Sequence, residues 1–256
     1  MTMPPPEPPE PQQPPEGPPP PEPQPAPPPG APDGAAPLPP EERIRLAYLR
    51  RNETDYIFDF WTALGWTLLT CGIYALYIVY QLVRRSRDHN ARRLEQLDAA
   101  NALAWDRANA QGLADELRPS FERTAAHLDV LRRQTTEFRD PTIWLVIAIF
   151  ASTIVEIILG VLLDQDLVTH DHAEGGAESE LAYAYGRLGT PIATPDPAQL
   201  HRPYEYVGRV IATLLTCGIY WLWWMYNLMV DGNAHFAKDW AWEDSLAQAV
   251  QTGGAA

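Results

Sequence analysis

Two stretches of this chain of 256 residues repeat one another: TLLTCGIYALYIVYQL at residues 67–82 and TLLTCGIYWLWWMYNL at residues 213–228. They align without a gap at an offset of 146 residues, and half of the 26 positions compared are identical. His89 and His235 match within this alignment. The sequence therefore predicts a duplicated unit, with a further apolar stretch, 141–163, between the copies.

Three long apolar runs predict that the chain enters a membrane. They cover residues 57–83, 141–163 and 206–230. About 20 apolar residues in a helix cross a hydrocarbon core of roughly 30 Å, and each run reaches that length. We therefore expect an all-α, multi-pass integral membrane bundle in the lipid bilayer of the cytoplasmic (inner) cell membrane. The first repeat then occupies 43–83 and the second occupies 206–238.

The centre of each repeat suits packing rather than chemistry. Small residues there let another backbone approach closely within lipid, and glycine permits a kink or a tight turn. Tyrosines follow, and an apolar ring with a polar tip suits a membrane–water boundary. We interpret the two cysteines as small packing residues rather than as a disulfide pair. The predicted packing residues are Thr70, Cys71, Gly72, Tyr74, Thr216, Cys217, Gly218 and Tyr220.

The motif, TCGIYALYIVY in the first copy and TCGIYWLWWMY in the second, resembles an uncharacterised bacterial membrane family, the domain of unknown function 4234. Proteins of that family similarly carry Pro-rich N-termini and basic sequence after the motif, here Arg84-Arg85-Ser86-Arg87. The resemblance covers the two apolar copies and their flanks, and it implies location and architecture only. The second copy departs from the pattern, with Asp231-Gly232-Asn233 in place of the basic flank.

Charge sets the predicted orientation. Five arginines lie within 84–93, so the segment 84–140 is predicted to be cytoplasmic. The segment 164–205 is mostly acidic and is predicted to be an external loop. Three crossings then make the two repeats parallel and leave the C-terminal tail, 239–256, in the cytoplasm.

A second topology stays open, because the first apolar run is basic on both sides. The arginines that precede it are Arg43, Arg45, Arg50 and Arg51. A re-entrant hairpin that turns at Cys71-Gly72 would keep both flanks on one side of the membrane. Its limbs, 57–70 and 73–83, would be roughly 21 and 16 Å long as helices, which is too short to cross singly.

The segment 84–140 is predicted to form a cytoplasmic helical hairpin. Apolar residues recur along it at three- and four-residue steps. Arg118-Pro119-Ser120 interrupts this pattern, because proline ends one helix and serine caps the next. The hairpin could bind a protein partner, or its apolar stripe could simply pack the hairpin on itself.

Residues 1–42 hold 21 of the 27 prolines and no lysine or arginine. Such a segment lacks the apolar area that offsets the entropy of ordering, so we expect it to be disordered. It could act as a solvated spacer, or it could present PxxP sequences to a protein partner.

Glu156 is the residue that most suggests chemistry. It lies inside the otherwise uncharged run 141–163, where an ionised residue costs about 2.5–3.5 kcal/mol and usually has a partner. Arg209, early in the third run, is the predicted partner, and Asp59 is the other charge at the membrane edge. Glu156 could serve a proton or cation relay, or it could form a structural ion pair or be a protonated, hydrogen-bonded acid.

A weak metal-binding pattern lies in the acidic loop. Its members are His170, Asp171, His172 and Glu174, in the sequence THDHAE. Because two histidines so spaced on a flexible loop are weak evidence, we expect a solvated acidic loop there. His89 and His235 are expected to pack at headgroup level. We therefore expect no metal and no other cofactor.

Composition and motifs exclude several classes of function. The net charge of −14 argues against nucleic acid, which needs clustered basic residues. The sequence has no phosphate-binding loop, nucleophile elbow, CxxC or HExxH, so we expect no enzyme. We expect a non-enzymatic membrane protein of interaction or scaffolding type. The alternative is a small transporter or channel that uses Glu156 and forms a homo-oligomer, because one chain leaves little room for a pore.

Overall fold

The computed structural model describes residues 38–253, and within that range the secondary structure is helical and contains no strand. This confirms the predicted all-α class. Residues 1–37 of the predicted disordered segment 1–42 lie outside the described residues, whereas residues 40–42 are helical, so the disorder predicted for them is wrong. The helices are α1 (Pro40–Leu49), α2 (Arg51–Thr54), α3 (Phe60–Leu69), α4 (Ile73–Gln111), α5 (Ala114–Thr136), α6 (Pro141–Arg187), η1 (Pro197–Gln199), α7 (Tyr206–Leu215) and α8 (Ile219–Gly253).

The first copy of the repeated motif folds as a short helix, a turn and a long helix. The turn joins α3 to α4, and both Cys71 (φ 50°) and Gly72 (φ 92°) adopt the left-handed backbone conformation. The backbone N–H of Tyr74 donates a hydrogen bond to the hydroxyl oxygen of Thr70 at 2.9 Å, which satisfies one free N–H at the start of α4. The motif residues therefore shape a turn.

The second copy repeats this geometry between α7 and α8. Cys217 (φ 51°) and Gly218 (φ 90°) are left-handed, and the N–H of Tyr220 donates to the hydroxyl of Thr216 at 2.9 Å. Both cysteines of the chain are exposed free thiols at the turns. That the motif residues also pack against another backbone in lipid stays a prediction.

These turns show that the prediction of single-helix crossings is wrong. The run 57–83 is divided between α3 and the start of α4, and the run 206–230 is divided between α7 and the start of α8. A right-handed helix does not continue through two consecutive left-handed residues. Across residues 38–253, no helix combines the length and the apolar character that crossing a membrane requires. The turn at Cys71 and Gly72 is the one that the hairpin topology demands.

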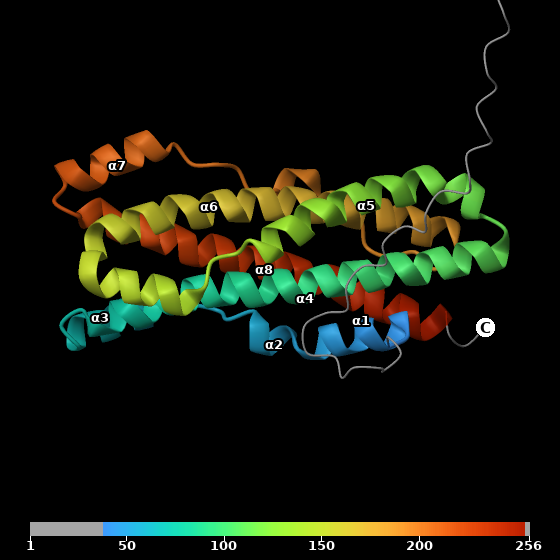
Figure 1. Ribbon diagram of the computed structural model, residues 1–256, viewed down its shortest axis with the longest axis horizontal. Helices are drawn as coiled ribbons and strands as arrows, with labels where there is room; N and C mark the ends of the chain where they lie inside the picture. The colour runs from blue at the N-terminus through green and yellow to red at the C-terminus, as the bar shows by residue number, and fades with distance from the viewer. Residues whose placement is uncertain (1–37, 254–256) are drawn as a thin grey trace, which may run out of the picture. The chain divides into compact units, whose positions relative to one another are not determined.

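The middle apolar run, 141–163, folds in a similar way. Ala151 interrupts α6 with non-helical dihedral angles (φ −143°, ψ 44°). Figure 1 shows the chain reversing direction there, at the same end of the bundle as the other two turns. The helix α6 therefore consists of a short first arm and a long second arm, like the pairs α3–α4 and α7–α8.

An acidic residue stands at the base of each hairpin, at matching positions. Asp59, Asp140 and Glu205 follow one another at offsets of 81 and 65 residues, and these offsets also relate residue 152, beside the break in α6, to Cys71 and Cys217. The side chains of Asp59 and Asp140 each accept a hydrogen bond from a backbone N–H in the first turn of their helices. The fold thus contains three units, of which the middle one lacks the sequence of the motif.

The long arms α4, α6 and α8 lie side by side and run in the same direction, and α5 and α1 pack against this group (Figure 1). Two apolar cores lie along them. One, which includes Val83 and Trp224, fills the space among the hairpins. The other, which includes Leu97 and Leu246, fills the opposite half of the bundle. A polar layer separates the two cores.

The predicted external loop, 164–205, is instead helical as far as Arg187, within α6. Apolar residues on its inner side, such as Ala177 and Leu181, are fully buried against α4 and α5. The two segments assigned to opposite sides of a membrane therefore pack on each other, and that assignment is wrong. Several acidic residues that suggested an exterior loop are buried partners of basic residues.

The predicted helical hairpin within 84–140 is present, but it turns at Gly112 (φ 72°). Pro119 lies inside α5, where the missing N–H removes one hydrogen bond near the beginning of the helix. The predicted C-terminal tail, 239–256, is also helical as far as Gly253, because Trp242 and other apolar residues complete the core that includes Leu97 and Leu246.

Exposed large apolar residues gather on the three hairpins. Among the described residues, the exceptions are Leu38, Leu49 and Tyr183, with Tyr56 and Ile57 just before the base of the first hairpin. Phe150, beside the break in α6, is 85% exposed, and Leu215, beside the turn of the third hairpin, is 79% exposed. The hairpin end of the bundle therefore presents an apolar surface larger than single scattered side chains would give.

Candidate metal centre

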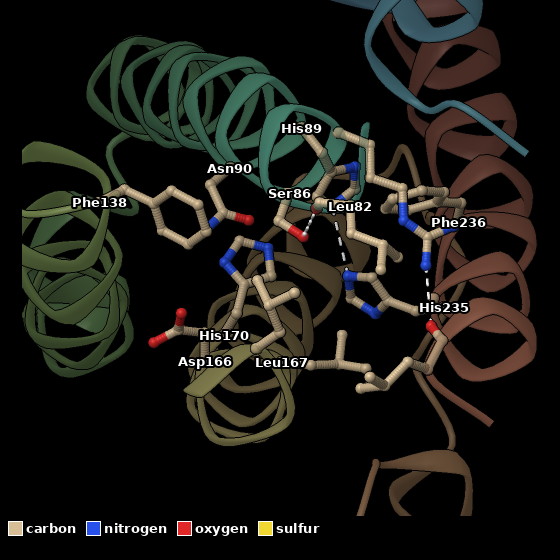
Figure 2. Close-up of a pocket in the computed structure, with 14 residues that line it drawn as sticks. Leu82, Ser86, His89, Asn90, Phe138, Asp166, Leu167, His170, His235 and Phe236 are labelled. Atoms are coloured by element: carbon tan, nitrogen blue, oxygen red, sulfur yellow. Dashed lines mark hydrogen bonds between the residues drawn. The ribbon is translucent and has the colours of Figure 1, made fainter. Parts of the chain in front are cut away.

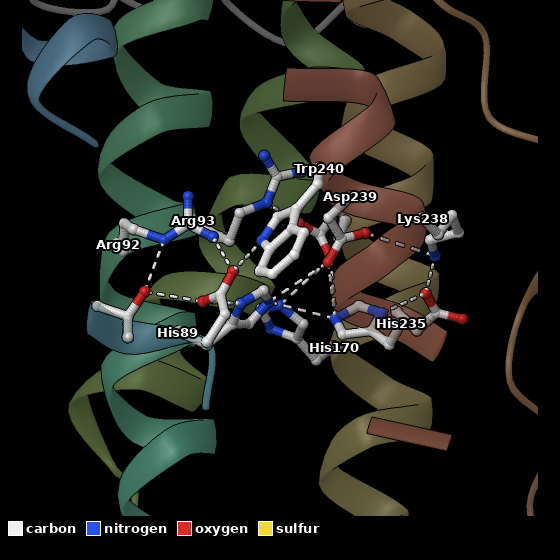
Figure 3. A network of polar contacts seen from close by, with 12 residues as sticks. His89, Arg92, Arg93, His170, His235, Lys238, Asp239 and Trp240 are labelled. Carbon is white, nitrogen blue, oxygen red and sulfur yellow. Dashed lines mark hydrogen bonds and ion pairs between the residues drawn. The ribbon is translucent and has the colours of Figure 1, made fainter. Parts of the chain in front are cut away.

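Three histidines meet in the polar layer between the two apolar cores. His89 lies on α4, His170 on α6 and His235 on α8, and all three are buried. Their ring centroids are 5.4, 5.1 and 5.5 Å apart, which makes a nearly equilateral triangle. Figure 3 shows the three rings pointing toward one another from the three long arms.

The spacing of the ring nitrogens fits a metal ion. The Nε2 atoms of His89 and His235 are 3.2 Å apart, and Glu174 Oε2 lies 3.4 Å from the Nε2 atoms of both His170 and His235. Four ligands placed about 2.1 Å from a tetrahedral ion are about 3.4 Å from one another. One ligand atom from each of the four side chains lies within 4.8 Å of all the others.

Hydrogen bonds fix which nitrogen of two histidines carries the proton. His89 Nδ1 lies 2.9 Å from Asp55 Oδ1, and His235 Nδ1 lies 3.0 Å from Asp171 Oδ1. Because each Nδ1 donates its proton to a carboxylate, each Nε2 presents a lone pair to the other. Two lone pairs at 3.2 Å repel unless a cation or a shared proton lies between them. A carboxylate behind a histidine is the usual arrangement of metal-binding histidines.

Burial keeps the His89 ring neutral. Burial lowers the pKa of His89 to about 3, although Asp55 acts in the opposite sense. Burial would raise the pKa of Asp55, but His89, Arg92 and the Trp240 indole hold that pKa well below its usual range. Burial also lowers the pKa of His170, and neither ring nitrogen of His170 has a hydrogen-bond partner among the described residues. Neutral imidazole is the form that binds metals.

Asp239 supplies a further oxygen at the same place. Its Oδ2 lies 3.2 Å from His235 Nε2 and 3.5 Å from His89 Nε2. Neither of its oxygens has a hydrogen-bond partner within residues 38–253. Burial, and then the charge of Glu174, raises the pKa of Asp239 well above its usual value. A buried carboxylate with free oxygens and two histidines in reach is a fifth candidate ligand.

Acidic side chains outnumber basic ones around the three histidines. Arg93 pairs with Glu174, Glu178 and Glu243, and Arg92 pairs with Asp55 and Glu243. Lys238 pairs with Asp171. The whole set consists of six acids and three bases: Asp55, Asp171, Glu174, Glu178, Asp239 and Glu243, with Arg92, Arg93 and Lys238. Because buried charges must be paired, the excess must be neutralised by protons or by a bound cation.

The sequence pattern THDHAE pointed to part of this centre. His170 and Glu174 belong to it, Asp171 supports His235 from behind, and His172 is exposed outside it. The expectation that His89 packs at headgroup level is wrong, because its ring is buried in the polar layer. The same holds for His235. The missed signal is spacing: each of the three histidines lies 18 residues after residue 71, 152 or 217 of its own unit.

The ionisable residues predicted to lie inside the membrane do not come together in the described part of the chain. Glu156 is half-buried against Trp221 and forms no ion pair with Arg209. The guanidinium of Arg209 instead stacks on the Tyr204 ring, 3.3 Å from its centroid. Asp59 caps α3. The predicted pairing of Glu156 with Arg209 is therefore wrong, because the two side chains face different neighbours.

Comparisons of this chain with protein-family models, with curated proteins and with solved structures find no match. The resemblance of its motif to the domain of unknown function 4234 therefore stays a prediction.

Proposed function

We propose that the protein is a membrane-embedded metalloprotein that holds one divalent transition-metal ion at His89, His170, His235 and Glu174. The observation that carries this proposal is the convergence of the Nε2 atoms of three histidines and a free carboxylate oxygen at the separations of metal ligands. Three imidazoles with a carboxylate suit zinc best among the common ions, with cobalt as a close substitute. The ion would join the three units and so hold together a scaffold with an apolar and a polar end.

A buried network without a metal is the competing account of the same residues. In that account, protons shared among the histidines, Asp239 and Glu178 neutralise the excess acids. The two accounts differ in metal content and in what happens when one ligand is removed, because a proton network needs no particular set of four donors.

The decisive experiment is the metal content of the purified protein. We expect close to one equivalent of zinc per chain by inductively coupled plasma mass spectrometry, after dialysis against a zinc-buffered solution. His170→Ala and Glu174→Gln should lose most of it. His172→Ala is the matched control, because its ring is exposed next to the same stretch of α6, and it should retain the metal. Substoichiometric zinc in the unaltered protein, or equal zinc in His170→Ala, would overturn the proposal.

The membrane part of the proposal rests on the hairpins. A ten-residue helix such as α3 or α7 is about 15 Å long, which is half of a hydrocarbon core of roughly 30 Å. We infer that the three apolar tips enter one leaflet of the cytoplasmic membrane and that the polar half of the bundle stays on one side. Exposed Trp61, beside Asp59 at the base of the first hairpin, supports this placement, because tryptophan is enriched at the membrane–water boundary. The scaffolding role expected from the sequence fits this arrangement.

A further inference from the structure

A small cavity adjoins the three histidines on the side of the hairpins. It has a volume of about 40 Å³, and its walls include all three imidazole rings. Figure 2 shows Phe138, Asn90, Ser86 and His170 around one shared space. The remaining walls come from α4, α6 and α8; they are apolar at Leu167 and Phe236 and charged at Arg85 and Asp166.

The cavity and the carboxylates of Glu174 and Asp239 lie in opposite directions along the long arms from the histidine triangle, although Asp166 also lines the cavity. Leu82, Leu163 and Leu228 line the cavity, and each lies seven residues before the histidine of its own unit, two helical turns toward the hairpin. Glu174 and Asp239 lie four residues after the histidines, one turn in the other direction. An ion held by the three Nε2 atoms and Glu174 would therefore have its carboxylate ligand on the side away from the cavity.

We propose that the metal ion carries one exchangeable coordination position that faces this cavity and takes water or a small anion. The inference rests on the proposed function, because it needs the ion to be present. A cavity of about 40 Å³ holds a water molecule, since about one probe sphere of 10–15 Å³ suffices for that. It is too small for a metabolite. The buried Asn90 side chain gives the incoming group a polar neighbour.

An open position separates two kinds of zinc centre. Structural sites are closed by four protein ligands, whereas catalytic sites keep a place for water and lower its pKa toward neutrality. The centre proposed here has four protein ligands, so water from the cavity would enter as a fifth ligand, a coordination number that zinc can reach. That water would lie at the boundary between the polar and apolar halves of the bundle.

The test uses the full chain loaded with cobalt(II), with azide as the probe. Cobalt(II) at this centre should give visible absorption bands, and azide should change them in a saturable way as it replaces water. If cobalt gives bands that excess azide leaves unchanged, the open position is refuted while the metal centre stands. If cobalt fails to bind at all, the proposed function itself fails.

Variants of the cavity walls show where azide binds. Leu163→Phe fills the cavity and should weaken azide binding at least tenfold while the cobalt bands persist. Leu49→Phe makes the same change at an exposed position on α1 and should leave azide binding unaltered. Because a filled core can fail to fold, Phe138→Ala provides a second measurement: it enlarges the cavity and should admit the bulkier thiocyanate ion. Unchanged anion affinities in both cavity variants would overturn the proposal.

Discussion

Asp55 and Asp171 act on two of the three histidines from behind. Each accepts the Nδ1 proton of one ring and so directs its Nε2 toward the centre. Asp55 directly follows the last residue of α2, and Asp171 follows His170 on α6. A histidine held in one tautomer loses less entropy on binding a metal and is a stronger base.

We expect Asp171→Asn to weaken metal binding by about 10–100-fold, because the amide no longer holds the His235 ring as a charged acceptor does. Competition with a chelator of known affinity measures this change. Asp129→Asn is the control, since Asp129 pairs only with Arg132 on an exposed face of α5. Equal affinity in the two variants would show that Asp171 has no part in orienting the ligand.

His201 predicts a dependence of stability on pH. Burial alone would lower its pKa, but the hydrogen bond and charge of Asp164, with Asp231 and Asp171 nearby, raise that pKa above 6.5. Stability from a group with a raised pKa in the folded state is present below about pH 6.5 and is lost as pH rises through the folded value. The Tm of the protein should therefore fall as the pH rises from about 6.5 through the pKa of His201 in the folded state.

Differential scanning fluorimetry from pH 6 to pH 9 checks this sign. His201→Gln keeps a hydrogen-bond donor but cannot be charged, so its Tm should start lower and change less across the range. Parallel profiles for the two proteins would mean that the ion pair between His201 and Asp164 contributes nothing.

At the scale of the elements, the hairpin turns decide the fold. In the repeated Thr-Cys-Gly, both the cysteine and the glycine adopt the left-handed backbone conformation. Glycine adopts it readily, whereas cysteine does so at a steric cost in free energy. The sequence allowed either a kinked crossing helix or a tight turn at this place. Propensity alone did not choose between them, because the choice depends on how α3 packs against α4.

Two glycines in the hairpins should respond to alanine in opposite directions. Gly218 has φ 90°, so Gly218→Ala should destabilise the fold by about 1–2 kcal/mol. Gly65 lies inside α3 with open space where a Cβ would stand, so Gly65→Ala should stabilise the fold by about 0.5–1 kcal/mol. Thermal unfolding in detergent micelles measures both. Shifts of Tm in the same direction would contradict the turn.

Some elements were readable in the sequence and others were not. Periodicity located the paired helices of 84–140, yet proline misplaced the turn, because α5 continues through Pro119 despite the loss of one backbone hydrogen bond. The acidic composition of 164–205 suggested a solvated loop, whereas the acids of its first half face arginines and histidines inside the bundle. Composition does not reveal such partners, since Arg93 and Glu178 are far apart in sequence.

The whole molecule has its polar half on one side of the apolar hairpins. Single cysteines at exposed Ala110, Ser179 and Gln251, on the three long arms, should therefore share the same accessibility to an impermeant maleimide in intact cells. The background replaces Cys71 and Cys217 by glycine, which tolerates their positive φ. Labelling of Ser179 alone would restore the topology of three crossings and refute entry into a single leaflet.

The candidate centre was not predicted from the sequence, for the same reason that the middle unit was not predicted. Residue identity marks two copies, whereas the middle copy keeps only spacing: its acid, its break and its histidine stand where the others have theirs. His89 and His235 were visible as equivalent residues, but their meeting point depends on His170, which the alignment of two copies leaves out. A search for equal intervals, rather than equal letters, would have joined all three.

The three units carry a trace of how such a centre can originate. A short ancestral chain with one hairpin and one histidine would, as three identical subunits around a threefold axis, bring its histidines together as α4, α6 and α8 do. Fusion of the subunits into one gene product ends the need for identity. One turn beyond each histidine stand Arg93, Glu174 and Asp239, three different residues at what would have been one position. Covalent linkage therefore permits a cation and two acids where symmetry would impose three equal charges.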